Sequence, residues 1–259
     1  MTGTEDPYSS LDILSSSLDL LGAAPIPDSP TVSYGTLVVS RPPRAGKANT
    51  LLADQVFNPG LVTAEQIESG RIDVEGQCVL ELGCGAGVPS LVAASLVAGG
   101  PQMVVMTDYP DEDLMDALQA NVERNAQLHC PVHIRGHAWG TDVQELLALL
   151  PPDKEGYDTL ILADLVHLTP PTAPLLASLT SLLAHTPTSR AYISVGAYTK
   201  QPVVDAFLLA TDDAGLVWEE WAMDGRWMGS EVIGIGEVRS REDMGELKKS
   251  VRGWIVRWR

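Results

Sequence analysis

Residues 79–87 read VLELGCGAG, an apolar run that ends in a turn with glycine at positions 83, 85 and 87. The run predicts a buried β-strand, and its abrupt change to flexible residues indicates that another molecule approaches the backbone there. The residues that follow, VPSLVAASLVAG at 88–99, predict an apolar helix. A helix that begins directly after such a turn presents free N–H groups to a polar or anionic ligand group.

Strands and helices alternate on both sides of this turn. The predicted strands are 77–83, 102–108, 132–139, 157–164 and 190–198, and the predicted helices are 88–99, 111–126, 142–151, 171–185 and 202–215. The alternation predicts an α/β fold with a doubly wound parallel sheet and right-handed crossovers. The nearly all-apolar strand 157–164 is expected at the centre of the sheet. The tail contains two strand-like runs, 216–224 and 251–259, with little helix between them, which indicates an antiparallel pair at one edge.

The first part of the chain is less regular. Leucines at 11, 14, 18 and 21 have helical spacing, and residues 31–40 predict one strand. Residues 51–70 predict a helix, a turn at 58–60 and a second helix that Gly70 ends. We therefore expect an N-terminal extension over residues 1–50 and one α/β domain over residues 51–259.

The charge balance restricts the partners of the protein. The 259 residues include 34 acidic and 17 basic side chains, a formal net charge of -17. A nucleic-acid partner is not expected, because such proteins need a basic face for phosphates. The acidity favours solubility or a basic partner. Three scattered cysteines fit a reducing compartment. No apolar run is long enough to span a membrane, so a membrane partner is not expected. We therefore expect a cytoplasmic or nuclear location.

Two acidic residues accompany the glycine turn. Glu81 stands two positions before the first glycine, and Asp108 ends the next predicted strand. A carboxylate at that strand end can accept hydrogen bonds from both hydroxyls of a ribose. The dinucleotide fingerprint G-x-G-x-x-G is not matched, because Val88 takes the place of its third glycine. The turn therefore departs from the fingerprint of an NAD-type site.

These residues together resemble motif I and the acidic loop of class I S-adenosylmethionine-dependent methyltransferases. The resemblance implies a seven-stranded Rossmann-like sheet with strand order 3-2-1-4-5-7-6 and S-adenosyl-L-methionine as cofactor. It implies that Asp108 holds the ribose, that Glu81 fixes the turn or meets the cofactor's amino group, and that Tyr109 lies against the adenine or packs on the next helix. Further cofactor-binding positions implied by the resemblance are Gly83, Cys84, Gly85, Gly87 and Ala163.

A closer resemblance extends from about residue 50 to the C-terminus. The stretches VLELGCGAGVPSLVA, VVMTDYPDEDLMDALQANVERN and ILADLVH look like the lysine-methyltransferase-like group, which includes fungal nicotinamide N-methyltransferase-like proteins and fungal elongation-factor methyltransferases. TDYPD followed by a helix bearing Asn121 is characteristic of that branch. In the group a tryptophan like Trp139 lines the adenine pocket, although a role in the core is the alternative. The aspartate after the fourth strand, here Asp164, helps to shape the site of the target amine.

The chain departs from that group at the acceptor site. His167 replaces an aromatic residue, and it acts either as a general base or as a hydrogen-bonding wall of the pocket. Phe57 and Asn58 are the nearest equivalents of a tryptophan-bearing segment that closes over the cofactor. Tyr198 is a candidate substrate contact or a surface tyrosine. The histidines at 129, 133 and 137 do not predict a metal site, because Pro131 and the strand-like residues around them exclude a helical face.

Three functions remain open from the sequence. The first is an S-adenosylmethionine-dependent N-methyltransferase for a protein amine, either a lysine or an N-terminus. The second is a small-molecule methyltransferase that acts on nicotinamide or a secondary metabolite, which the replacements at His167 and Phe57 would favour. The third is a methyltransferase fold that has been repurposed for other chemistry. In-line methyl transfer requires a correctly placed neutral nucleophile, and Asp164 could orient such an amine.

Overall fold

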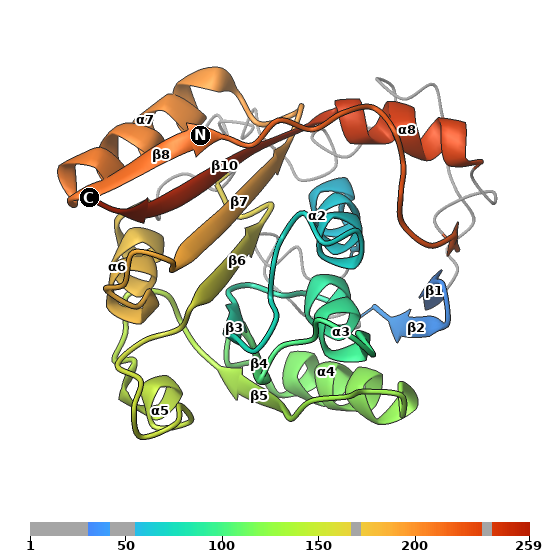
Figure 1. Cartoon of the computed structure of the whole chain (residues 1–259), viewed down its shortest axis with the longest axis horizontal. Helices are drawn as coiled ribbons and strands as arrows, with labels where there is room; N and C mark the ends of the chain where they lie inside the picture. The colour runs from blue at the N-terminus through green and yellow to red at the C-terminus, as the bar shows by residue number, and fades with distance from the viewer. Residues whose placement is uncertain (1–30, 42–54, 167–171, 235–239) are drawn as a thin grey trace, which may run out of the picture.

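The structure, a computed structural model, describes residues 31–41, 55–166, 172–234 and 240–259. The leucine-rich segment expected to be helical at 10–21 and the candidate residue His167 lie outside these ranges. Figure 1 shows a central twisted sheet with helices on both faces and a small separate sheet that contains the first two strands, β1 and β2.

Seven strands form the central sheet in the order β5-β4-β3-β6-β7-β10-β8. Numbered by their sequence within this sheet, they follow the order 3-2-1-4-5-7-6, so the predicted fold is confirmed. Their bounds are β3 Cys78–Glu81, β4 Met103–Asp108, β5 Val132–Gly136, β6 Thr159–Ala163, β7 Arg190–Gly196, β8 Leu216–Glu220 and β10 Val251–Trp258. The first five are parallel, whereas β10 is antiparallel to both β7 and β8. Strand β6 is central, as its apolar sequence predicts.

The helices divide between the two faces of the sheet. One apolar core contains side chains from α2 Asn58–Glu68, α3 Val88–Ser95, α4 Glu112–Arg124 and α8 Arg241–Lys249. The other contains side chains from α5 Gln144–Leu147, α6 Thr172–Leu182 and α7 Gln201–Asp213. Alternate residues of one strand serve the two cores: Val79 of β3 faces the first, and Leu80 faces the second.

The expected single strand over residues 31–40 is instead a hairpin. Strands β1 Thr31–Tyr34 and β2 Leu37–Ser40 pair antiparallel across a turn at Gly35 and Thr36. Gly35 has φ 56°, a backbone conformation that glycine adopts without steric cost. Strand β9 Val232–Ile233 pairs with β1 to complete a three-stranded sheet.

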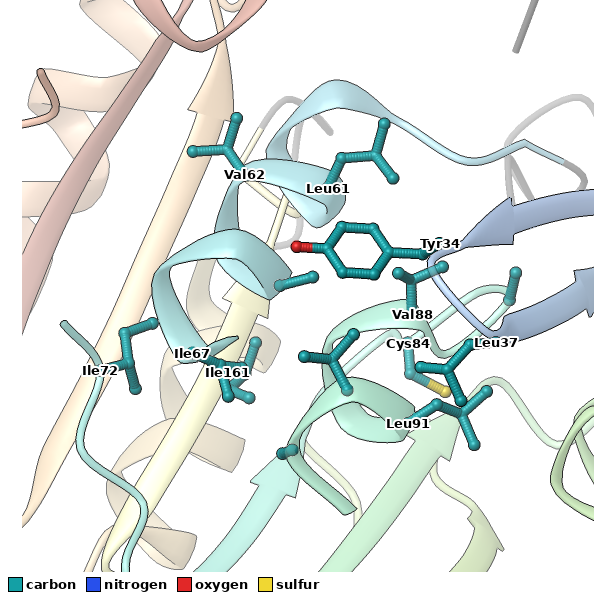
Figure 2. Close-up of a cluster of buried hydrophobic side chains, with 14 of the residues drawn as sticks. Tyr34, Leu37, Leu61, Val62, Ile67, Ile72, Cys84, Val88, Leu91 and Ile161 are labelled. Atoms are coloured by element: carbon teal, nitrogen blue, oxygen red, sulfur yellow. The ribbon is translucent and has the colours of Figure 1, made fainter. Parts of the chain in front are cut away.

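The hairpin is part of the core beside the glycine turn. Figure 2 shows Tyr34 and Leu37 directed from the hairpin toward side chains of α2 and α3. Backbone groups of β2 are also bound by two asparagines, one in α4 and one at its C-cap. Asn121 and Asn125 each exchange hydrogen bonds with one β2 residue, Ser40 and Val38 respectively. The two side-chain amides therefore satisfy backbone N–H and C=O groups of β2 that a neighbouring strand would otherwise bind.

Two further expectations about helices are corrected. The residues expected as a turn at 58–60 form the first turn of α2, because a proline is tolerated in the first turn of a helix, where its missing N–H has no intrahelical partner. The tail contains α8 between its two strands. Ser240 and Asp243 form a capping box at the start of α8.

A buried ion pair joins α8 to α2. The Lys248 ammonium lies 2.9 Å from the Glu65 carboxylate, and both side chains are fully buried. Lys248 also donates to the carbonyl oxygen of Arg226, and Glu65 accepts from the backbone N–H of Met228. The segment before β9 is thereby fixed to α2, whose first residues adjoin the site described next.

Candidate functional site

The candidate site lies where the winding of the parallel sheet reverses. Strands β3 and β6 are neighbours, but the chain proceeds from β3 to β4 on one side and from β6 to β7 on the other. In sheets of this type ligands bind at such a point, beyond the carboxyl ends of the strands. The glycine turn follows β3, and the loop that begins at Asp164 follows β6. The two segments are therefore adjacent in the folded protein.

The glycine turn has a backbone that other residues would strain. Gly83, Gly85 and Gly87 have φ values of 57°, 54° and 79°. A Cβ atom at Gly83 would lie 2.6 Å from Cδ2 of Leu165 and 3.2 Å from Cζ2 of Trp139. A Cβ at Gly87 would lie 2.0 Å from Cε of Met106. The turn therefore needs glycine both for its dihedral angles and for the close packing beneath it.

Glu81 supports the turn from within the core. Its carboxylate accepts hydrogen bonds from the backbone N–H of Ser90, at 3.1 Å, and from the Ser90 hydroxyl, at 2.5 Å. Ser90 lies in the first turn of α3, so Glu81 satisfies one of the free N–H groups there. Burial raises the pKa of Glu81 to about 8, although the bonds from Ser90 oppose this shift. The geometry corresponds to the first of its two expected roles, fixing the turn.

Cys84 directs its side chain away from the turn's open side. Its thiol packs in the apolar core beside Val88 and Leu91, as Figure 2 shows. Burial raises the pKa of this thiol well above its ordinary value, so it remains protonated. Its backbone N–H donates to the carbonyl oxygen of Thr107 at 2.9 Å. Contact between Cys84 and a ligand would therefore involve backbone atoms.

Asp108 connects the end of β4 to the glycine turn. Its Oδ2 accepts from the backbone N–H of Gly85, and its Oδ1 accepts from that of Tyr109, both at 2.7 Å. The residue is 8% exposed, and burial raises the pKa of its carboxyl while the two N–H donors partly lower it. Each oxygen retains capacity for a further hydrogen bond. The ring of Tyr109 beside it is 50% exposed.

Trp139 approaches the same turn from the segment after β5. Its ring lies against Gly83, as the distance from a Cβ there shows. Its segment is fixed on both sides. His137 donates its backbone N–H to the Asp108 carbonyl oxygen at 2.7 Å, and its Nε2 lies 2.8 Å from the Ser178 hydroxyl. The Ser178 hydroxyl also accepts from the Gly140 N–H. Trp139 therefore has a defined place beside the turn.

Asp164 follows Ala163, the last residue of β6, and is held by three groups. Its backbone N–H donates to the Ser194 carbonyl oxygen at 2.7 Å. Oδ1 accepts from the Gly196 N–H at 3.3 Å, and Oδ2 accepts from the Tyr198 hydroxyl. Asp164 has φ 64° and is the only non-glycine residue with positive φ in the described ranges. Such a backbone conformation is unfavourable and concentrates at functional sites.

The start of α2 reaches the same region. Phe57 is the N-cap of α2 and Asn58 is its first residue; both are half-buried. The hydroxyl of Ser194 lies 3.4 Å from the Pro59 carbonyl oxygen and 2.9 Å from the Thr63 hydroxyl. Since Ser194 also accepts from the backbone of Asp164, the first turn of α2 adjoins the Asp164 loop. The candidate substrate residues Phe57, Asn58 and Tyr198 thus come from segments around one position.

Several residues that shape the site were not anticipated from the sequence. Leu165 packs against Gly83, Ser178 orders the segment that carries Trp139, and Ser194 joins α2 to the Asp164 loop. The serines come from secondary-structure elements whose sequences give no indication of a polar role. Leu165 follows Asp164 directly, yet only the strand order shows that it meets the glycine turn.

The strand order, the glycine turn with Glu81 behind it and Asp108 at the end of the neighbouring strand together define a class I S-adenosylmethionine-dependent methyltransferase fold. Within that class, the chain belongs to the lysine methyltransferase family, whose sequence model matches residues 48–206.

Curated relatives are fungal enzymes. The chain is 38% identical over 128 residues to protein N-terminal and lysine N-methyltransferase efm7 of Emericella nidulans, a match that covers 46% of this chain and 48% of the relative. It thus spans about half the length of that relative. A match to EFM7 of Gibberella zeae is 34% identical over 227 residues and covers 80% of this chain and 79% of the relative.

A solved structure, the O-methyltransferase from Bacillus cereus in complex with SAH, aligns with 98% of this chain and 90% of its own. Its sequence identity is 15% and its TM-score is 0.45.

The residues present fit S-adenosylmethionine, the methyl donor of this class. Asp108 offers a buried carboxylate with free acceptor capacity, which suits the two ribose hydroxyls. Tyr109 and Trp139 supply aromatic rings near the carboxylate and the turn. The positive φ angles of the three glycines give the turn a backbone conformation that other residues rarely adopt. In the described residues no helix is long and apolar enough for a membrane crossing.

Proposed function

We propose that the protein transfers a methyl group from S-adenosylmethionine to an amine of a protein substrate, either a lysine side chain or an N-terminal amine. The observation that carries the proposal is the Asp164 carboxylate, held by Gly196 and Tyr198 at the end of β6, the strand that pairs with β3 before the glycine turn, in a family of lysine methyltransferases. The names of the fungal relatives, protein N-terminal and lysine N-methyltransferases, support a protein acceptor. A net charge of -17 suits a basic target.

We assign the cofactor contacts to the segments around the switch point. Asp108 would hold the ribose, while Tyr109 and Trp139 would contact the adenine. The backbone from Gly83 to Gly87 would hold the methionine part, with Glu81 fixing the turn. When bound, the cofactor supplies an electrophilic methyl group on a positively charged sulfur.

The acceptor residues would position the amine. Asp164 is placed to accept hydrogen bonds from the amine and to favour one orientation of its lone pair. The Tyr198 hydroxyl and the Gly196 N–H already fix this carboxylate, so it does not need to reorganise when a substrate arrives. Phe57 and Asn58 would form the nearby wall. We keep His167 as the candidate base that accepts the proton of the amine, with a hydrogen-bonding wall as its alternative role.

The test is methyl transfer from radiolabelled S-adenosylmethionine into fungal cell extract. The extract is divided by size before the reaction, so that proteins and small molecules are offered separately. We expect label on a protein band, located by mass spectrometry on a lysine or N-terminus, and no label with Asp164→Ala. Label in the small-molecule fraction alone would overturn the proposal. So would absence of label from both fractions while calorimetry shows that the cofactor binds.

A further inference from the structure

A groove lies between α7 and β8. It has a volume of about 440 Å³ and is lined by Asp205, Leu208, Leu209, Asp212, Val217 and Trp218. Leu209 is 63% exposed and Trp218 is 43% exposed. Figure 1 shows α7 and β8 at the end of the sheet opposite β5. The groove thus brings two exposed apolar side chains together with the carboxylates of Asp205 and Asp212.

The groove borders β8, the last strand of the central sheet in the described part of the chain. Strand β8 pairs with β10 on one side, and no strand in the described residues pairs with its other side. Its outward N–H and C=O groups can therefore accept an added strand from an extended peptide. Glu219 and Glu220, both exposed, end this strand. A second copy of the chain would bring an equally acidic surface to this strand, so the net charge disfavours pairing of the edge with itself.

The charges of α7 and β8 are of one sign. Residues 201–220 contain Asp205, Asp212, Asp213, Glu219 and Glu220 and no lysine, arginine or histidine. Among neighbouring basic groups, Arg259 is bound to Asp212, and Arg257 is in register with Val217 of β8. The excess of carboxylates around two exposed apolar side chains complements a segment in which basic and apolar residues alternate.

From the edge, the groove and the charge we infer that β8 and α7 form a docking site for an extended basic segment of the protein substrate, added as a strand to β8 at a distance from the methylated amine. This inference rests on the proposed function for the identity of the partner. Apolar side chains of the segment would lie beside Leu209 and Trp218, and its basic side chains beside the carboxylates.

The sheet geometry sets the spacing between the two sites. Strand β8 is parallel to β7, since both are antiparallel to β10, and β7 is parallel to β6. Glu220, at the carboxyl end of β8, therefore lies toward the same end of the strands as Asp164, which follows β6. Four inter-strand steps of ~4.8 Å separate β6 from a strand added to β8, about 19 Å in all. An extended chain spans at most ~3.6 Å per residue. The docking segment and the methylated residue must therefore be separated by about six residues or more.

A binding experiment tests the inference without reference to activity. The probe is a fluorescein-labelled peptide, Arg-Leu-Arg-Val-Lys-Leu, with a counterpart in which glutamate replaces each basic residue. Fluorescence anisotropy at low salt measures its affinity for the full chain. We expect the basic peptide to bind and the acidic one not to bind. Asp205→Lys combined with Glu220→Lys should weaken binding at least 10-fold, and Trp218→Ser should also weaken it.

Asp153→Lys combined with Glu155→Lys is the matched control, because it changes net charge equally at another exposed loop. The inference is overturned if both charge variants weaken binding equally, or if neither does. It is also overturned if sedimentation shows a dimer that Trp218→Ser dissociates, since the groove would then be an interface between copies. Calorimetry with S-adenosylmethionine, which we expect to be unchanged in all these variants, separates failure of this site from failure of the proposed function.

Discussion

The hydroxyl of Tyr198 donates a hydrogen bond to Oδ2 of Asp164, across the loops that follow two neighbouring strands of the sheet. Burial and the nearby carboxylate raise the pKa of Tyr198, so the hydroxyl keeps its proton and remains a donor. A Cβ at Gly196 would lie 2.3 Å from the Tyr198 ring, so only glycine there lets the ring cross the backbone. The relationship fixes the orientation of the carboxylate that we assign to the target amine.

Removing the Tyr198 hydroxyl should reduce catalysis more than cofactor binding. Tyr198→Phe deletes a hydrogen bond to a charged group, which contributes roughly 1.5–3 kcal/mol. We expect kcat/KM for the methyl acceptor to fall about 10- to 100-fold, while the affinity for S-adenosylmethionine stays the same. Steady-state kinetics and calorimetry measure the two quantities.

Thr199→Val provides the control for that variant. Thr199 is the neighbouring residue and is buried. Its Oγ1 has no hydrogen-bond partner among the described residues, so the replacement removes none of their hydrogen bonds. Its kinetics should match those of the unmodified protein. Equal losses in Tyr198→Phe and Thr199→Val would show that the loop, and not the hydroxyl, matters.

The Asp108 carboxylate should determine cofactor affinity. Asp108→Ala removes the acceptor that joins Gly85 and Tyr109 and leaves the ribose without its expected partner. The Kd for S-adenosylmethionine should rise at least 10-fold, as hydrogen bonds to a charged group imply. Titration calorimetry measures this constant. Glu112→Gln, an exposed carboxylate in the first turn of α4, should leave it unchanged. An unaltered Kd in Asp108→Ala would refute the assignment.

The contribution of Glu81 to the free energy of unfolding should decrease as the pH rises. The pKa of Glu81 is about 8 in the folded protein against an ordinary value of 4.5, so the folded state binds the proton more tightly. Its contribution to stability is therefore complete below pH 4.5 and declines as the pH rises toward 8. Glu81→Gln keeps an acceptor for Ser90 without this ionisation. The difference in Tm, variant minus parent, should become more positive between pH 5 and pH 8. A difference in Tm that stays the same in thermal melts at several pH values would contradict a raised pKa of the Glu81 carboxyl.

Gly87 should tolerate substitution less than a glycine with a similar backbone elsewhere. Gly87→Ala adds a Cβ 2.0 Å from the Met106 methyl group and also strains a φ of 79°, so it should destabilise by about 2–4 kcal/mol. Gly99 has a φ of 69°, but no atom of the described residues lies within 4 Å of a Cβ there, so Gly99→Ala should cost about 1 kcal/mol. Urea unfolding measures both values. Equal losses of stability in the two variants would show that the positive φ, and not the contact with Met106, causes the destabilisation.

The sequence predicted the fold because local patterns determine most of it. Apolar runs placed β3, β4, β6 and β7, and the Gly-x-Gly-x-Gly turn placed the switch point. Two errors had readable signals. Gly35 within 31–40 indicates the hairpin turn, and Ser240 with Asp243 indicates the start of α8. The error at Asn58 and Pro59 arose because a proline suits either a turn or the first turn of a helix.

The candidate site was predictable only in part. Asp108 and Asp164 could be placed at strand ends because parallel strands end at one edge of the sheet. The bond from Tyr198 to Asp164 could not be predicted, since it spans 34 positions and depends on side-chain directions after two different strands. The same holds for Ser178 and His137, which meet only because α6 packs against the end of β5.

The side chain of Asn121 links the glycine turn to strand β2 through two hydrogen bonds. Its Nδ2 donates to the carbonyl oxygen of Ala86 within the glycine turn and to that of Ser40 in β2, at 3.2 Å and 2.9 Å. A single amide thus connects the turn to a strand more than 40 positions earlier in the sequence. A nucleoside that orders the turn would also hold Asn121 in place, and with it the hydrogen bond that the Ser40 N–H donates to Asn121. The exchange of the Ser40 amide proton with deuterium should therefore become slower when the nucleoside binds.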